Sequence, residues 1–122
     1  MINNIKQTRG IRGATTVANN LPEEIVAATR ELLERIMENN SIDTRDIAAI
    51  FFSATPDLSG AFPAKAARDM GWLDVPLFCM VEIDVPESLA KCIRIMMLVN
   101  TTWKQADIKH VYLKETIRLR EQ

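Results

Sequence analysis

Four polar side chains that could bind a charged ligand stand beside aliphatic residues in this sequence: Arg12, Glu82, Arg94 and Tyr112. The most apolar setting is that of Arg94, in the run CIRIMMLVN. A guanidinium group stays protonated in proteins, so a chain that buries it must supply an anion. Arginine binds carboxylates through two parallel hydrogen bonds. Taken together, the four side chains predict a pocket for a small ligand that carries carboxylate groups and a hydroxyl group.

Each of these residues also has an ordinary structural interpretation. An arginine in a strand commonly points to solvent, and Tyr112 alone fits a core position. Glu82 and Arg94 could simply pair with each other. The residues by themselves therefore leave open whether the chain is a binding protein or an enzyme.

Residues for covalent, metal or nucleotide chemistry are poorly represented. The single histidine, His110, cannot form a metal cluster alone and is typical of a strand residue near the surface. A nucleophilic pair of Cys79 and His110 has no supporting signature nearby. Lys65 could form a Schiff base, but a solvated lysine is the more ordinary interpretation, and GIRG lacks the spacing and lysine of a phosphate-binding loop. We therefore expect no metal ion and no cofactor.

Composition indicates one globular domain over residues 1–122. Hydrophobic residues make up 48% of the chain and charged residues 25%, both near globular averages. A formal net charge of −1, from 15 basic and 16 acidic side chains, argues against a nucleic-acid partner. No apolar run is long enough to span a membrane, and the N-terminus lacks the apolar core of a secretory signal. Cys79 and Cys92 are typical of free thiols, which favours a reducing cytoplasm.

The sequence pattern predicts about five strands, one long helix and several short helical turns. The helix is the clearest element, because apolar residues recur at helical spacing from Pro22 to Asn39. Strands are expected over residues 7–16, 47–53, 75–83 and 93–99, and residues 110–119 could form one long strand or a hairpin. Short helical turns are expected over residues 43–46, from Pro63 to Gly71, and over residues 86–92.

These elements predict an α+β fold in which helices cover one face of a mixed sheet. The strands over residues 47–53, 75–83 and 93–99 are too apolar for the other face to meet water, and one long helix covers only one face. We expect another copy of the chain to cover it. Ligand sites would then lie at the boundaries between subunits.

Several sequence blocks occur in order across nearly the whole chain: RGIRGATT, SATPDL, FPAKAAR, GW, the CM-x-E-x-DV pattern, KCIRIMM and HVYL. Together they resemble the small trimeric, barrel-type chorismate mutases. The resemblance implies a homotrimer with a barrel-like core and active sites at subunit interfaces. It also implies the isomerisation of chorismate to prephenate, on the route to phenylalanine and tyrosine. That reaction is an intramolecular Claisen rearrangement, which needs no cofactor, metal ion or covalent intermediate.

The same resemblance assigns roles to the polar residues. Arg94 would stabilise the negative charge that builds on the ether oxygen in the transition state. Arg12 would bind the side-chain carboxylate, with a hydrogen bond from Tyr112 nearby. Glu82 would accept a hydrogen bond from the ring hydroxyl, helped by the backbone N–H of Cys79.

Further positions match the walls and mouth of the family's pocket. The wall positions, which the family shares across the subunit boundary, are Phe62, Ala64, Lys65, Leu77 and Phe78, with Leu119 as an apolar wall in the tail. Arg68 and Arg120 match positions near the mouth, where they would draw in or enclose a dianion. Phe78 departs from the threonine expected in relatives, so the hydroxyl contacts would be lost and the wall would be bulkier. Because the sequence ends at Gln122, we expect no longer closing segment after Arg120.

Two alternatives accompany this assignment. One is a non-catalytic small-molecule-binding or regulatory trimer that keeps the pocket. The other is a trimeric imine deaminase of similar fold, which also places an arginine at a subunit boundary. The order of the blocks GIRGATT, FPAKAAR and CIRIMM speaks against the deaminase, and an intact set of polar residues speaks against lost activity.

Overall fold

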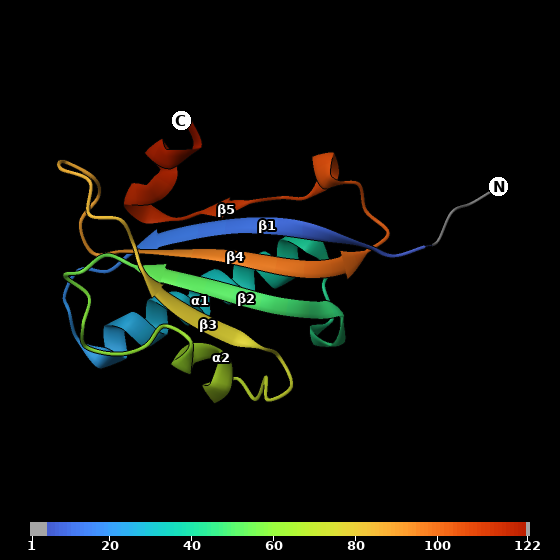
Figure 1. The fold of residues 1–122 in the computed structure, drawn as a ribbon, viewed down its shortest axis with the longest axis horizontal. Helices are drawn as coiled ribbons and strands as arrows, with labels where there is room; N and C mark the ends of the chain where they lie inside the picture. Colours follow the sequence, from blue (N-terminus) through green and yellow to red (C-terminus); the bar gives the residue numbers. More distant parts are fainter. Residues whose placement is uncertain (1–4, 122) are drawn as a thin grey trace.

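The computed structural model describes residues 5–121, which form a five-stranded mixed sheet with the strand order β3-β2-β4-β1-β5 (Figure 1). The strands are β1 (Gln7–Thr16), β2 (Ile47–Ala54), β3 (Leu77–Val81), β4 (Cys92–Thr101) and β5 (Val111–Tyr112). The central strand β4 pairs antiparallel with β1 and β2, whereas β3 and β5 add in parallel at the two edges. The α+β fold class predicted from the sequence is confirmed.

The long helix α1 (Pro22–Asn40) begins and ends where local chemistry favours it. A proline opens its first turn, and Glu23 and Glu24 lie where the helix dipole favours negative charge. Ser41 ends the helix in a left-handed conformation with φ of 51°. The second helix, α2 (Lys65–Asp69), is a single short turn of helix. Figure 1 shows α1 running across one face of the sheet, with α2 beside it near β3.

The hydrophobic core fills the space between α1 and the sheet. Leu32 and Ile36 of α1 pack against Ile11, Phe52 and Met97 of three strands, and all five side chains are fully buried. Burying a side chain of this size stabilises the fold by about 1.5–3 kcal/mol.

Gly13 lets the helix approach the backbone of β1 closely. A Cβ atom at this position would lie 2.7 Å from Ile36 Cδ1 and 3.2 Å from Leu32 Cδ1. Because both helix side chains are fully buried, they have no open space into which they could retreat. The absence of a side chain at residue 13 therefore allows the close separation between α1 and β1.

The opposite face of the sheet is covered by neither α1 nor α2. It presents Phe51 and Met96 together with the exposed side chains of Phe78 and Met80. An exposed apolar surface of this kind marks a place where another molecule binds. The expectation that a further copy of the chain covers it stays a prediction.

Most predicted elements match the structure, and the differences have local causes. The helical turn expected over residues 86–92 is wrong, because Glu87 and Lys91 have φ values of 68° and 47° and form a loop. The strand or hairpin expected over residues 110–119 is confirmed only at β5 (Val111–Tyr112) and is wrong beyond it. The chain leaves the sheet after Tyr112 and enters a 3-10 helix, η3 (Lys114–Glu121). Its start is held by Thr116, whose hydroxyl donates to the Ala14 carbonyl at 3.0 Å.

Shorter elements complete the chain. Two further 3-10 turns are η1 (Thr44–Asp46) and η2 (Gln105–Asp107). The third strand covers fewer residues than the predicted 75–83, since Pro76 has no N–H to donate to the sheet. Among residues 5–121, no helix combines the length and the apolar content that crossing a membrane requires.

Candidate functional site

The register of the sheet aligns polar residues in one row across the open face. Tyr112 of β5 lies beside Ala14 of β1, which pairs with Arg94 of β4. Arg94 pairs in turn with Ser53 of β2, and Ser53 with Met80 of β3. Side chains at paired positions share a face of the sheet. Residues from five strands, far apart in the sequence, therefore meet on one surface.

A second row runs parallel to the first. Arg12 of β1 pairs with Met96 of β4, which pairs with Phe51 of β2, and Phe51 pairs with Phe78 of β3. The rings of Phe51 and Phe78 meet edge to face, with centroids 6.4 Å apart and planes at 75°. This contact holds Phe78 against the sheet, although 59% of its surface is exposed.

The two rows enclose a cavity of about 280 Å³ on the open face. Four predicted site residues line it, namely Arg12, Arg94, Tyr112 and Leu119. Its remaining lining includes Ser53 and Met80, which the sequence analysis did not single out. The cavity thus combines two guanidinium groups, a phenol and apolar walls, as expected for an anionic organic ligand.

Glu82 does not line this cavity, but its carboxylate lies near Arg94 without closing on it. The Arg94 Nε atom lies 3.7 Å from Glu82 Oε2, beyond hydrogen-bond distance, and the side chains are 46% and 26% exposed. Ser53 donates a hydrogen bond to the same Oε2 atom at 2.5 Å. The pairing of Glu82 with Arg94 that the sequence left open is therefore a loose one. Partly exposed pairs of this kind contribute only about 0–1 kcal/mol, so both groups are available to a ligand.

Arg12 is held from behind by the single histidine. The backbone N–H of Arg12 donates to His110 Nδ1 at 2.9 Å, so the imidazole must be neutral to make this bond. Burial, with the positive charge of Arg12 as a second cause, lowers the pKa of His110 below its ordinary value. The neutral acceptor is thus the stable form near neutral pH.

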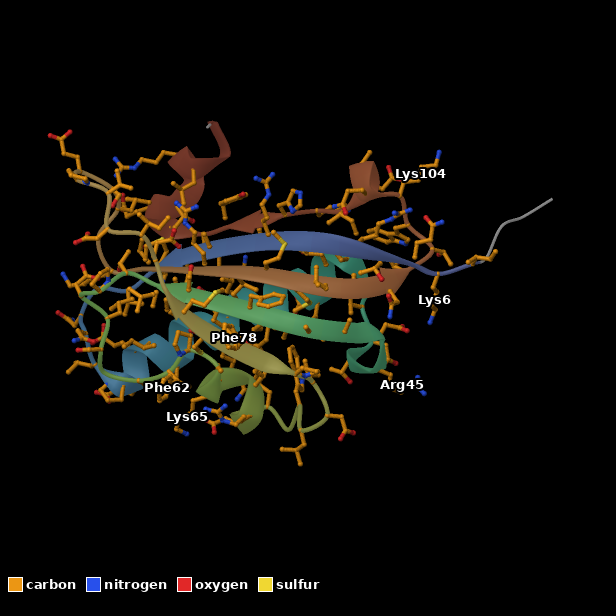
Figure 2. The ribbon with its side chains drawn as sticks, viewed as in Figure 1. Lys6, Arg45, Phe62, Lys65, Phe78 and Lys104 are labelled. Carbon is orange, nitrogen blue, oxygen red and sulfur yellow. The ribbon has the colours of Figure 1, made fainter. Side chains whose placement is uncertain are left out.

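A second cavity of about 460 Å³ lies between β3 and the loop that follows β2. Phe62 and Cys79 line it, and Met80 borders both cavities. The loop is fastened to the start of β4 by Asp57, whose carboxylate accepts a hydrogen bond from the backbone N–H of Lys91 at 2.9 Å. Figure 2 shows Phe62 and Lys65 near α2, with Phe78 on the neighbouring strand β3.

The remaining predicted residues lie outside both cavities or beyond the described side chains. Ala64 is buried in the core, and Leu77 packs against it. Lys65 and Arg68 are exposed on α2, where Lys65 forms an ion pair with Asp69 at 2.9 Å. The side chain of Arg120 lies outside the described part of the structure. Within one chain, the predicted residues therefore fall into separate groups and do not form one closed pocket.

Nucleophilic chemistry has little support in this geometry. Cys79 lies on β3 and His110 immediately precedes β5, so one chain places them at opposite edges of the sheet. Burial raises the pKa of the Cys92 thiol, which opposes formation of a reactive thiolate. Among the side chains that the structure describes, no three from His, Cys, Asp or Glu gather as metal ligands would.

Sequence reasoning missed Ser53 and Phe51, although both belong to the open face. They alternate with buried residues along β2, and this alternation is the signal that could have placed them. The run IAAIFFS hides it, because both faces of this strand are apolar.

Comparisons with known proteins agree with one another. A family model described as "Chorismate mutase type I" matches residues 8–122. The chain is 51% identical over 113 residues to chorismate mutase AroH from Bacillus subtilis (strain 168), which covers 92% of this chain and 89% of that protein. Chorismate mutase AroH from Thermus thermophilus is 50% identical over 113 residues, covering 92% and 93%. A solved chorismate mutase from Clostridium thermocellum superposes with a TM-score of 0.87 at 56% identity, covering 88% of this chain and 96% of that one.

Proposed function

The chain belongs to the chorismate mutase type I family, and on that premise we propose that it isomerises chorismate to prephenate in phenylalanine and tyrosine biosynthesis. The observation that carries the proposal is the row that brings Arg94 and Tyr112 into one cavity, with the Glu82 carboxylate 3.7 Å from Arg94. These groups bind and polarise a substrate but offer no nucleophile. Two free cysteines fit an enzyme that works in a reducing cytoplasm.

The rearrangement places few chemical demands on the protein. The ether C–O bond of the enolpyruvyl arm breaks while a C–C bond forms between that arm and the ring, and no proton or electron enters or leaves. Holding the substrate with its arm folded over the ring removes much of the entropic barrier. Negative charge grows on the ether oxygen as the bond breaks, and a fixed cation beside it stabilises the transition state more than the ground state.

Each polar residue then has a distinct role in the proposal. Arg94 is the cation that faces the ether oxygen. Arg12 binds the side-chain carboxylate, and the Tyr112 hydroxyl donates a hydrogen bond close by. Glu82 accepts a hydrogen bond from the ring hydroxyl, with the backbone N–H of Cys79 as a second contact.

We further propose that the active enzyme is a homotrimer whose sites lie at subunit interfaces. Support comes from the uncovered apolar face and from the separation of the predicted residues into two groups within one chain. A neighbouring copy would bring its own wall residues to the cavity that holds Arg94. Those wall residues are Phe62, Ala64, Lys65, Leu77 and Phe78, with Arg68 near the mouth. Leu119 and Arg120, in the tail, would close the mouth over the dianionic substrate.

The decisive test is the disappearance of chorismate, followed by absorbance, with purified protein whose mass in solution is measured in parallel. Turnover together with a trimeric mass is the expected result. A trimer that binds chorismate without converting it would leave the binding or regulatory alternative. The imine deaminase alternative is not supported by the matched family.

A further inference from the structure

Ser53 lies at the centre of the row that carries the polar residues. It stands between Arg94 of β4 and Met80 of β3, near the end of β2. Its side chain lines the same cavity as Arg94. None of the assigned roles uses it, yet it is the neighbour of the residue on which the proposed chemistry depends.

The hydroxyl of Ser53 makes one strong contact. It donates to Glu82 Oε2 at 2.5 Å, within the range of about 2.5–2.7 Å for a hydroxyl bound to a carboxylate. Arg94 Nε approaches the same oxygen and stops at 3.7 Å. From the side chains described in the structure, Glu82 Oε1 accepts no hydrogen bond. One carboxylate oxygen is thus occupied by the protein, and the other remains for a ligand.

Glu82 needs such a contact, because little else fixes it. It follows the last residue of β3 and begins the loop over residues 82–91. Its own backbone N–H bonds to the Ala54 carbonyl at 2.9 Å, which anchors the main chain but leaves the side-chain torsions free. A glutamate side chain loses considerable rotamer freedom when it is fixed. The bond from Ser53 selects one rotamer before substrate arrives.

We propose that Ser53 is a positioning residue that holds the Glu82 carboxylate apart from Arg94 and turns its second oxygen toward the substrate. The inference rests on the proposed function, since it concerns how that site is organised. Without the hydroxyl, the carboxylate is attracted to the guanidinium and closes to direct contact at about 2.7–2.9 Å. That contact would occupy the group that the ether oxygen needs and withdraw the acceptor from the ring hydroxyl.

A double-mutant cycle tests whether Ser53 acts through Glu82. Ser53→Ala is expected to lower kcat/KM for chorismate by about tenfold, because displacement of a catalytic group by an ångström costs that much or more. In a Glu82→Ala background the same change should alter kcat/KM by less than about twofold. Ser53→Thr, which keeps a hydroxyl, should restore most of the activity. Ser88→Ala, in the exposed loop, is the matched control and should behave as wild type.

Equal losses in both backgrounds, or no loss from Ser53→Ala alone, would overturn the proposal, because either result means that Ser53 does not act through Glu82. Crystal structures of unliganded wild type and Ser53→Ala provide a test that needs no turnover. The expected result is a direct Arg94–Glu82 contact in the variant alone, and an unchanged separation would refute the positioning role. If wild type itself fails to convert chorismate, the proposed function falls, and these structures still decide what Ser53 does.

Discussion

The Arg94 guanidinium is partly exposed and has an anion nearby, but it forms no tight ion pair. Its side chain is 46% exposed in the single chain, and its nearest anion stays 3.7 Å away. A tight ion pair would satisfy the guanidinium, and substrate would then have to break it. In the proposed mechanism, the loose arrangement leaves the guanidinium free to meet the negative charge that develops on the ether oxygen.

Replacement of Arg94 by lysine tests the importance of its planar group. Arg94→Lys keeps a positive charge but loses the fork that can contact two oxygens. We expect kcat to fall by about 10²–10³-fold, the cost of removing one donor to a developing oxyanion. Steady-state kinetics measure the fall, and circular dichroism and solution mass should match wild type. Near-normal turnover would remove Arg94 from its role.

His110 gives a second prediction at this scale, on stability. Its pKa in the folded protein is lowered, by burial and then by Arg12, from an ordinary value of 6.5. The unfolded chain therefore takes up the proton first as the pH falls, so stability declines below about pH 6.5 and the full loss is reached below the folded pKa.

Proton NMR can follow this titration without ambiguity, because the chain has a single histidine. Urea unfolding of wild type at about pH 7.5 and about pH 5.5 should show the loss of stability. His110→Asn keeps an acceptor for the Arg12 N–H but does not titrate, and it should lose less stability over the same interval. An equal loss in both proteins would assign the effect to other groups.

The elements that the sequence predicted well are those with strong hydrophobic periodicity. The helix predicted from Pro22 to Asn39 ends one residue later in the structure, and the strand predicted over residues 7–16 matches β1. The prediction is poor for the region after β4, because side chains rather than a backbone ladder bond this region to the edge of β1. Gln105 bonds to both the N–H and the C=O of Gly10, at 2.9 Å and 2.7 Å, and His110 accepts from Arg12. Such contacts leave no periodic pattern in the sequence.

Asn40 likewise uses its side chain to bond to backbone, in this case between α1 and the segment before β5. The residue is only 3% exposed. Its side chain accepts a hydrogen bond from the Lys109 N–H at 2.7 Å and donates one to the Lys109 carbonyl at 2.9 Å. These bonds hold the segment that leads into β5, which is only two residues long and carries Tyr112.

Asn40→Ala should lower the free energy of unfolding by about 1–3 kcal/mol, the cost of leaving a buried polar group without a partner. Asn39→Ala, at the exposed neighbouring position, is the matched control and should change it by less than about 0.5 kcal/mol. Denaturant unfolding measures both. If the two variants were equally stable, Asn40 would not anchor β5.

At the scale of the whole molecule, the exposed apolar surface extends beyond the site. The edge strand β3 and the residues after it expose Phe78, Val81 and Ile83, the last two by 74% and 78%. An uncovered apolar edge strand invites association with other chains, and native proteins cover or charge such edges. A sequence reports this surface only as an excess of apolar residues. It cannot show which part of a second copy meets it, so the grouping of the wall residues was not predictable from one chain.

Val81→Asp tests the proposed assembly. A carboxylate at this exposed position should leave the fold of the chain intact but oppose burial against a partner, since burying an unpaired charge is costly. We expect most of the trimer to dissociate, as measured by light scattering, with loss of turnover. Ala27→Asp, on the solvent side of α1, adds the same charge elsewhere and should remain trimeric. A trimeric Val81→Asp protein would place the interface on another surface.

Gly13 has a consequence for anyone who diversifies this chain in the laboratory. It adjoins Arg12 in the sequence, but a Cβ atom at residue 13 would point toward α1. That atom would lie 2.7 Å from Ile36 Cδ1. A library that randomises codons around the anion pocket would include this position for its proximity. A side chain there would clash with Ile36 and Leu32 of α1, so α1 or β1, the strand that carries Arg12, would have to shift. Variants at residue 13 would therefore lose activity as active-site variants do, although the cause would be a changed separation between α1 and the sheet.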